Sequence, residues 1–165
     1  MALYKIVIYP DPMLKRKAEE VHNLDHNIIK TIKDMTNTMY ASKGIGLAGP
    51  QVGILSRVAV IDTSFGKDIS HPLVLINPRI IEQEGYVKGE EGCLSFPNMY
   101  APVARHERVL IEYIDKKGKE VRFEARDFLA RVLQHEIDHL EGVCFIDRLS
   151  KIRRDIIKRK FLKKR

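Results

Sequence analysis

Apolar residues recur at helical spacing in three parts of the chain. Asp25 is a predicted N-cap for a helix that runs to about Ser42, and Gly44 follows at the position of a C-terminal cap. A second helix is predicted over 127–140, and its wide apolar surface is typical of a helix lodged in the core. A third helix begins near Leu149 and places three isoleucines on one side, namely Ile152, Ile156 and Ile157.

Shorter runs rich in β-branched and aromatic residues predict strands between these helices. Residues 4–9 form a strand or extended segment that a proline-rich turn closes. Five further strands are expected, at 57–62, 73–77, 80–87, 109–114 and 120–124, and the last two form a hairpin through Lys117 and Gly118. Helices and strands mix irregularly without an internal repeat. The predicted class is therefore α+β, with antiparallel or mixed sheets around the second helix and a helix at the C-terminus.

Size and composition fit one globular domain. The chain has 165 residues, of which 44% are hydrophobic and 31% charged, enough for a single core. No apolar run is long enough to span a bilayer. The N-terminus lacks the apolar segment and cleavage site of a secretory signal, so a cytoplasmic location without membrane association is expected.

The net charge of +7 lies almost entirely at the C-terminus. Residues 151–165 contain nine Lys or Arg and one Asp, whereas residues 1–150 are nearly neutral, with 20 basic and 21 acidic side chains. This asymmetry indicates an acidic partner for the C-terminal segment, although a solubilising, partly frayed end is the simpler alternative. We expect 1–150 to form a single catalytic domain and 151–165 to extend it as a basic helix or tail.

The motif His135-Glu136-Ile137-Asp138-His139 lies inside the second predicted helix. Since each residue turns a helix by about 100°, the two histidines project about 40° apart on the same face and can bind one metal ion. Glu136 flanks them closely enough to take a proton from a metal-bound water. The alternative, two ordinary histidines beside a helical glutamate, is much less common for this motif.

A catalytic centre of this type needs a third protein ligand and an open position for water. No histidine follows His139, and Glu141 is too near on the helix to reach the same ion. The candidate is Cys93, because a thiolate binds divalent iron or zinc well, although a lone cysteine is more often a small buried residue. No function is assigned to the other cysteine or the other histidines, which are Cys144, His22, His26, His71 and His106.

A glycine-rich stretch at 44–51 reads Gly-Ile-Gly-Leu-Ala-Gly-Pro-Gln. Its first six residues match a dinucleotide-binding fingerprint, but that fingerprint needs a strand before it and a helix after it. A helix precedes this stretch and a strand follows it, so nucleotide binding is rejected. The glycines instead predict a loop whose backbone passes close to a substrate, with Gln51 as an amide donor.

Together, three segments resemble the signature of peptide deformylases: GIGLAGPQ at 44–51, EGCLS at 91–95 and QHEIDHLEG at 134–142. The resemblance extends over nearly the whole chain, including YPDP at 9–12. Two positions depart from the usual pattern. Gly49 stands where the family usually has a second alanine, and Tyr100 stands where some bacterial members have an arginine near the mouth of the site.

The resemblance implies removal of the formyl group from the N-terminal formyl-methionine of new polypeptides, with release of formate. It implies a metal ion held by Cys93, His135 and His139, with ferrous iron (Fe²⁺) as the native ion and Zn²⁺ or Ni²⁺ as substitutes. Glu136 would move the proton. The Gln51 side chain and the Leu94 N–H would donate to the carbonyl oxygen in the transition state.

The resemblance also indicates how the substrate binds. Its backbone would pair with the chain near Gly46 and Gly92, and its methionine side chain would contact Ile45, Phe128 and Val132. Plain core packing is an equal alternative for those last three residues. Arg105 and Glu91 could pair with each other or contact the substrate. A movement of residues 64–71 over the site stays open.

Bacterial members end in a basic helix that docks on the ribosome near the nascent-chain exit, which makes the ribosome the expected partner of 151–165; specific DNA binding is not expected. Two other functions fit the sequence less well. A peptidase with the same helix motif fits poorly with an upstream cysteine ligand. A ribosome-associated binding protein with a structural metal fits poorly with Glu136 and an incomplete ligand set.

Overall fold

The computed structural model describes residues 2–64 and 71–164. Its larger sheet is antiparallel, with strands in the order β1-β2-β3-β6-β7. These strands are β1 (Gly46–Ala48), β2 (Val58–Ile61), β3 (Leu73–Glu84), β6 (Arg108–Ile114) and β7 (Glu120–Arg126). A second antiparallel sheet consists of β4 (Val87–Cys93) and β5 (Phe96–Arg105). The predicted α+β class is confirmed.

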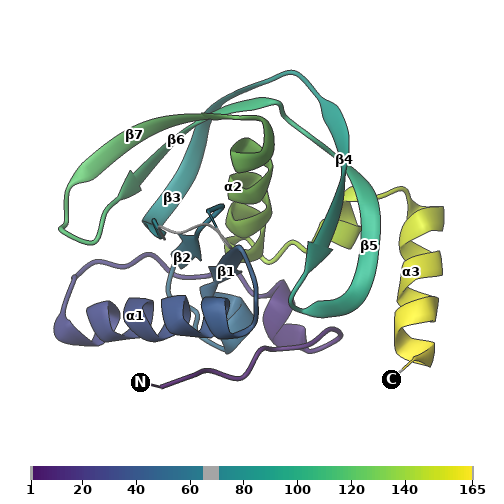
Figure 1. The fold of residues 1–165 in the computed structure, drawn as a ribbon, viewed down its shortest axis with the longest axis horizontal. Coiled ribbons are helices and arrows are strands. Elements are labelled where there is room, and N and C mark those ends of the chain that lie inside the picture. Colours follow the sequence, from purple (N-terminus) through teal and green to yellow (C-terminus); the bar gives the residue numbers. More distant parts are fainter. Residues whose placement is uncertain (1, 65–70, 165) are drawn as a thin grey trace.

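Three α-helices complete the fold, and one of them lies between the sheets. They are α1 (His26–Ala41), α2 (Asp127–Leu140) and α3 (Lys151–Lys163). Figure 1 shows α2 at the centre, with the larger sheet on one side and the β4–β5 hairpin on the other. Every residue of α2 from Ala130 to Leu140 is buried, so its polar side chains must find partners inside the protein. None of the helices in the described residues is long and apolar enough to cross a membrane.

Three apolar clusters hold these layers together. One lies between α2 and the larger sheet and includes Leu75, Ile111 and Leu133. A second lies between α1 and the other face of β1 and β2. The third joins β5, the short 3-10 helix η3 (Phe145–Arg148) and α3. Among the described residues, only the first cluster contains residues of α2, which pack directly on the larger sheet, whereas the other two hold α1 and α3 in place.

The β-structure between 73 and 105 differs from the prediction. The segments 73–77 and 80–87 belong largely to one strand, β3, which passes Pro78 through a register shift, with Asn77 in the left-handed region at φ 51°. Strands β4 and β5 were not predicted beyond Val87. Their glycines and prolines hide the alternation that β5 nevertheless shows, with Phe96, Met99, Ala101 and Val103 buried. The predicted hairpin of β6 and β7 is confirmed.

Two details around α1 need correction. Asp25 does cap the helix, since its side chain accepts a hydrogen bond from the Ile28 N–H at 3.0 Å. The residue in the left-handed region after the helix is Lys43, at φ 57°, and not Gly44. Gly44 is small for another reason, because a Cβ there would lie 2.7 Å from Leu94 Cδ1. The stretch that follows is also not a plain loop, since it forms β1 and the short 3-10 helix η2 (Gly49–Val52).

The orientation of α3 also differs from the prediction. Ile152 is 74% exposed and Ile156 is exposed as well, so the predicted apolar face is wrong for two of its three isoleucines. The inner face consists instead of Ile157 and Phe161, which are one helical turn apart. Phe161 packs on the rings of Phe96 and Tyr9, with centroid separations of 5.6 and 5.9 Å.

Candidate metal centre and active site

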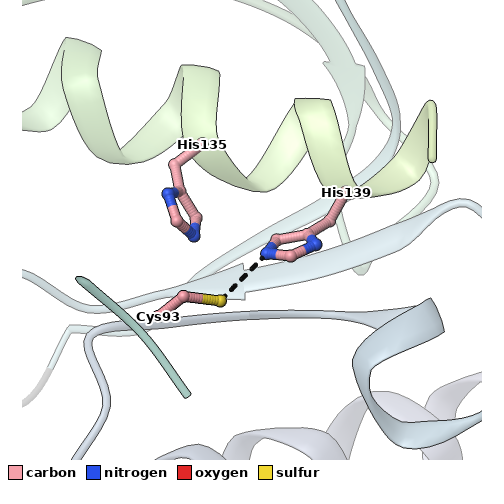
Figure 2. Close-up of side chains that lie close together, drawn as sticks. All are labelled: Cys93, His135 and His139. Carbon is pink, nitrogen blue, oxygen red and sulfur yellow. Dashed lines mark hydrogen bonds between the residues drawn. The ribbon is translucent and has the colours of Figure 1, made fainter. Parts of the chain in front are cut away.

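Cys93, His135 and His139 are brought together in the space between the sheets. Cys93 ends β4, and both histidines project from α2 toward it (Figure 2). One ligand atom from each of the three residues lies within 4.8 Å of the others, and Cys93 Sγ is 3.3 Å from His139 Nε2. In the part of the chain that the structure describes, this is the one group of three or more such donors that could hold a metal ion.

The chemistry of these donors fits a divalent transition metal. A thiolate and two imidazoles are ligands that Fe²⁺, Zn²⁺ and Ni²⁺ accept. His135 Nδ1 lies 2.8 Å from Glu91 Oε1, which leaves Nε2 free to face the centre. A carboxylate that holds the outer nitrogen fixes the ring of a ligating histidine. Three protein ligands leave a coordination position for water or substrate.

Glu91 binds three of the polar side chains around this centre. Its Oε1 accepts a hydrogen bond from Arg105 Nη2 at 2.9 Å, and its Oε2 accepts from Arg105 Nε at 2.8 Å and from Arg131 Nη1 at 2.7 Å. Burial alone would raise the pKa of Glu91, but hydrogen bonds from Arg105 and His135 lower this pKa to about 2. Of the two alternatives for Arg105, the ion pair with Glu91 is therefore observed, and the arginine is only 3% exposed.

Glu136 is buried beside the metal centre. Among the described residues no hydrogen-bond partner lies on its Oε2, and burial raises the pKa of the carboxyl to about 7. The carboxylate rests against the Cα of Gly46 on β1, so that any side chain at Gly46 would collide with it. A carboxyl group with a pKa near neutrality can both accept and return a proton.

Gln51 lies in η2 with its amide held from two sides. Its Oε1 accepts a hydrogen bond from the Ala48 N–H at 3.0 Å, and its Nε2 donates to Ser95 Oγ at 3.2 Å. The same Nε2 is 3.4 Å from Cys93 Sγ. Leu94 follows Cys93 in the turn between β4 and β5. Gln51 and Leu94 therefore both lie beside the metal centre.

A cavity of about 550 Å³ opens beside these groups. Of the residues predicted for the site, ten line it: Ile45, Gly46, Gln51, Gly92, Cys93, Leu94, Phe128, Val132, His135 and Glu136. Phe128 is 55% exposed, so core packing does not account for it, whereas Ile45 and Val132 line the cavity and also pack on the core. Tyr100 lies at the rim with its ring over Gly92. The segment 65–70, part of the stretch whose movement stayed open, lies outside the described residues.

A larger hollow, of about 910 Å³, lies elsewhere, against β3, β6 and β7. Its charged groups largely bind one another, as Arg57 does Glu141 at 2.7 Å and Arg122 does Glu112 at 2.8 Å. It contains no cluster of metal ligands among the described residues. The candidate metal ligands and proton-transfer group therefore lie at the smaller cavity and not at this one.

Several residues of the site were not predicted. Arg131 binds Glu91 and the backbone carbonyls of Val87 and Val103, and Ser95 orients Gln51. Asp138 binds Arg105. One local signal pointed to these contacts: Arg131 and Asp138 are charged, although they lie in a helix that is expected to face the core.

A centre of this kind, open on one side and next to a carboxyl group that can exchange a proton, belongs to the metal-dependent hydrolases. The sequence model of the family described as "Polypeptide deformylase" matches residues 3–155. The chain therefore belongs to the polypeptide deformylase family.

Similar proteins cover the chain almost end to end. The peptide deformylase of Thermodesulfovibrio yellowstonii is 46% identical over all of both chains, and that of Syntrophobacter fumaroxidans is 49% identical over 99% of this chain and 96% of its own. The crystal structure of a peptide deformylase from Legionella pneumophila superposes with a TM-score of 0.92 at 40% identity, covering 98% of this chain and 95% of that one. A deformylase from Synechococcus elongatus in complex with actinonin gives 0.91 at 40% identity, covering 95% and 86%.

The activity follows from membership of this family. The chain is a metal-dependent hydrolase that removes the formyl group from the N-terminal formyl-methionine of newly made polypeptides and releases formate.

Proposed function

We propose that Cys93, His135 and His139 hold ferrous iron in the native enzyme, with Zn²⁺ or Ni²⁺ as substitutes, and that Glu136, Gln51 and Leu94 carry out the hydrolysis. The observation that carries this proposal is the meeting of one thiol and two imidazoles within 4.8 Å, next to the buried carboxyl of Glu136. When bound, such an ion polarises the formyl oxygen and lowers the pKa of a water molecule, so that the water attacks near neutral pH.

Glu136 moves the proton in this scheme. Its carboxylate accepts a proton from the water as the water oxygen attacks the formyl carbon. The C–N bond then breaks, and Glu136 returns the proton to the amine nitrogen that leaves. Formate and a free N-terminus are the products. Burial suits Glu136 to both steps, because it brings the pKa of the carboxyl close to the working pH.

Gln51 and Leu94 stabilise the negative charge that develops on the formyl oxygen. The Gln51 amide and the Leu94 backbone N–H donate hydrogen bonds to this oxygen. The contacts of Gln51 with the Ala48 N–H and with Ser95 fix its orientation before the substrate arrives. Such preorganised donors are typically worth roughly a hundredfold or more in rate.

The cavity accounts for the choice of substrate. Gly46 on β1 and Gly92 on β4 border it and present backbone groups to an extended peptide. Ile45, Phe128 and Val132 offer apolar surface to the methionine side chain. A formyl carbon carries only hydrogen besides its oxygen and nitrogen, so a tight centre admits it and excludes bulkier acyl groups. This restriction distinguishes the proposal from a general peptidase.

Protein loaded with Fe²⁺ without oxygen is expected to release formate from a formyl-Met tripeptide with a higher kcat/KM than Zn²⁺-loaded protein. Replacing Cys93 by alanine should weaken metal affinity by more than the roughly 10–100-fold that loss of an outer partner costs. Formate release and bound metal are measured on the same samples, with Cys144→Ala as the matched control, because that buried thiol is not one of the three candidate ligands. Equal rates with both metals would contradict the iron assignment, and unaltered affinity of Cys93→Ala would contradict the ligand set.

We further propose that 1–150 is the catalytic part, that 151–165 binds the ribosome, and that the enzyme works in the cytoplasm. The cations of α3 and the family resemblance support this role. Lys151, Arg153, Arg159, Lys160 and Lys163 are all exposed. Deleting the segment is a poor test, because Phe161 belongs to the core beside Tyr9 and Phe96.

Changing Arg159, Lys160 and Lys163 together to glutamine is expected to weaken ribosome binding while leaving the rate on a short peptide unchanged. Loss of three phosphate contacts should reduce the slope of log affinity against log salt concentration by roughly three. The measurement is co-sedimentation with ribosomes at several salt concentrations. The matched control changes the exposed Lys116, Lys117 and Lys119 to glutamine. Equal affinity of the two triple variants would exclude α3 from ribosome binding.

A further inference from the structure

A chain of charged side chains runs from the metal centre to the segment before α3. Arg105 Nη1 donates a hydrogen bond to Asp138 Oδ2 at 2.6 Å, while its Nε and Nη2 bind Glu91. Asp138 in turn accepts from Arg148 Nη2 on Oδ1 at 2.6 Å and from Arg148 Nε on Oδ2 at 3.0 Å. At the inner end, Glu91 binds Nδ1 of His135.

Each link of this chain restricts the next. Arg105 uses all three guanidinium nitrogens on two carboxylates, so the plane of its guanidinium is set by both Glu91 and Asp138. Asp138 projects from α2 one turn after His135, but its carboxylate can still rotate about χ2. The two contacts from Arg148 fix this rotation, because a guanidinium and a carboxylate paired at two points share one plane.

Burial makes these contacts costly to lose. Glu91, Arg105 and Asp138 are all buried, so an unpaired charge among them would lack the solvation that water provides. Arg148 is the outermost member, with a half-exposed side chain in η3, two residues before the N-cap of α3 at Ser150. It is the one member of the chain whose side chain reaches the surface, and Asp138 keeps its contact with Arg105 when Arg148 is changed.

From these contacts we infer that Asp138 and Arg148 are positioning residues for the metal centre, which act on His135 through Arg105 and Glu91. The inference rests on the proposed metal ligands. It assigns a role to a side chain on η3 that touches neither the cavity nor the three metal ligands. A purely structural pair would affect only the stability of the fold, whereas a positioning pair also affects how the metal is held.

Cobalt(II) is the probe for this inference, because a thiolate–cobalt centre has visible absorption bands that report ligand geometry. In Arg148→Met the absorption bands are expected to shift relative to those of the wild type. Release of cobalt to a chelator should be roughly 3–10-fold faster, which is at or below the roughly 10–100-fold effect of losing a direct partner of a ligating histidine. Asp138→Asn, one step closer, should release the ion roughly 10–100-fold faster. Arg148→Lys should restore part of the loss, since an ammonium group can still donate to Asp138.

The matched control is Arg122→Met, which removes an arginine from the exposed pair with Glu112 on the larger sheet. Its cobalt spectrum and release rate should equal those of the wild type. If Arg148→Met lowers the melting temperature while its spectrum and release rate stay at wild-type values, the inference is overturned. If the wild type itself gives no thiolate–cobalt band, the proposed ligand set fails instead, so the two failures are distinguishable.

Discussion

Glu136→Gln is expected to lower kcat for formate release by roughly a thousandfold, within the 10²–10⁴-fold range of general acid–base catalysis, with the metal still bound. Glutamine has nearly the same shape as glutamate and fits against Gly46, but its amide cannot accept the proton from water. The measurements are formate release from a formyl-Met tripeptide and the metal content of the same sample. Glu141→Gln is the control, because Glu141 follows the same helix but pairs with Lys17 and Arg57 away from the cavity.

A stability measurement separates this loss of function from damage to the fold. Burial raises the pKa of Glu136 in the folded protein to about 7, above the ordinary value of 4.5. Because the pKa of the carboxyl is raised on folding, its ionisation destabilises the folded state. The resulting loss in the free energy of unfolding grows from pH 4.5 upward and is complete above pH 7. Metal-free Glu136→Gln should therefore be more stable than metal-free wild type at pH 8 and equally stable at pH 4. Lower stability of the variant at pH 8 would contradict this account of Glu136.

The second large effect is expected from Glu91→Gln, which should lower the free energy of unfolding at pH 7 by about 3 kcal/mol. The substitution leaves Arg105 and Arg131 buried without their shared carboxylate. A single amide oxygen then replaces two charged oxygens as the acceptor for both arginines and for His135 Nδ1. We also expect metal affinity to fall by roughly 10–100-fold, as for other partners of ligating histidines. The measurements are urea unfolding and metal release.

The pH dependence of Glu91→Gln has a definite sign. The pKa of Glu91 is depressed from 4.5 to about 2 in the folded protein, so its stabilising contribution is complete above pH 4.5. The difference between wild type and variant should shrink as the pH falls from 4.5 toward 2. Glu112→Gln is the control, since Glu112 also binds two arginines, Arg79 and Arg122, but at the surface, where such pairs contribute roughly 0–1 kcal/mol. A constant difference from pH 7 to pH 3 would mean that charge is not the cause.

The sequence predicted those parts of the molecule that depend on local pattern. The bounds of α2 agree with the prediction at both ends, because a long apolar surface and the helix motif occupy the same 14 residues. The meeting of Cys93 with the two histidines was also predicted, by excluding other ligands. The β4–β5 hairpin was missed because its glycines and prolines resemble loop composition.

The polar contacts behind the metal centre could not be predicted in the same way. Glu91, Arg105, Arg131, Asp138 and Arg148 come from four different elements, and no local period relates their positions. Such contacts depend on how the hairpin packs against α2, which is a property of the whole fold. The inner face of α3 was misjudged for a similar reason. Ile157 and Phe161 face inward because the Tyr9–Phe96 cluster lies there, and the helix itself contains other isoleucines that would serve equally well.

The cavity is bordered by one edge of each sheet. Strand β1 is the outer strand of the five-stranded sheet, and β4 has β5 on one side only, while Gly46 and Gly92 face the same hollow. An extended peptide seated between them would act as a bridging strand that joins the two sheets. Main-chain groups are common to every polypeptide. An enzyme that held its substrate in this proposed way would accept nascent chains of almost any sequence beyond the first residue.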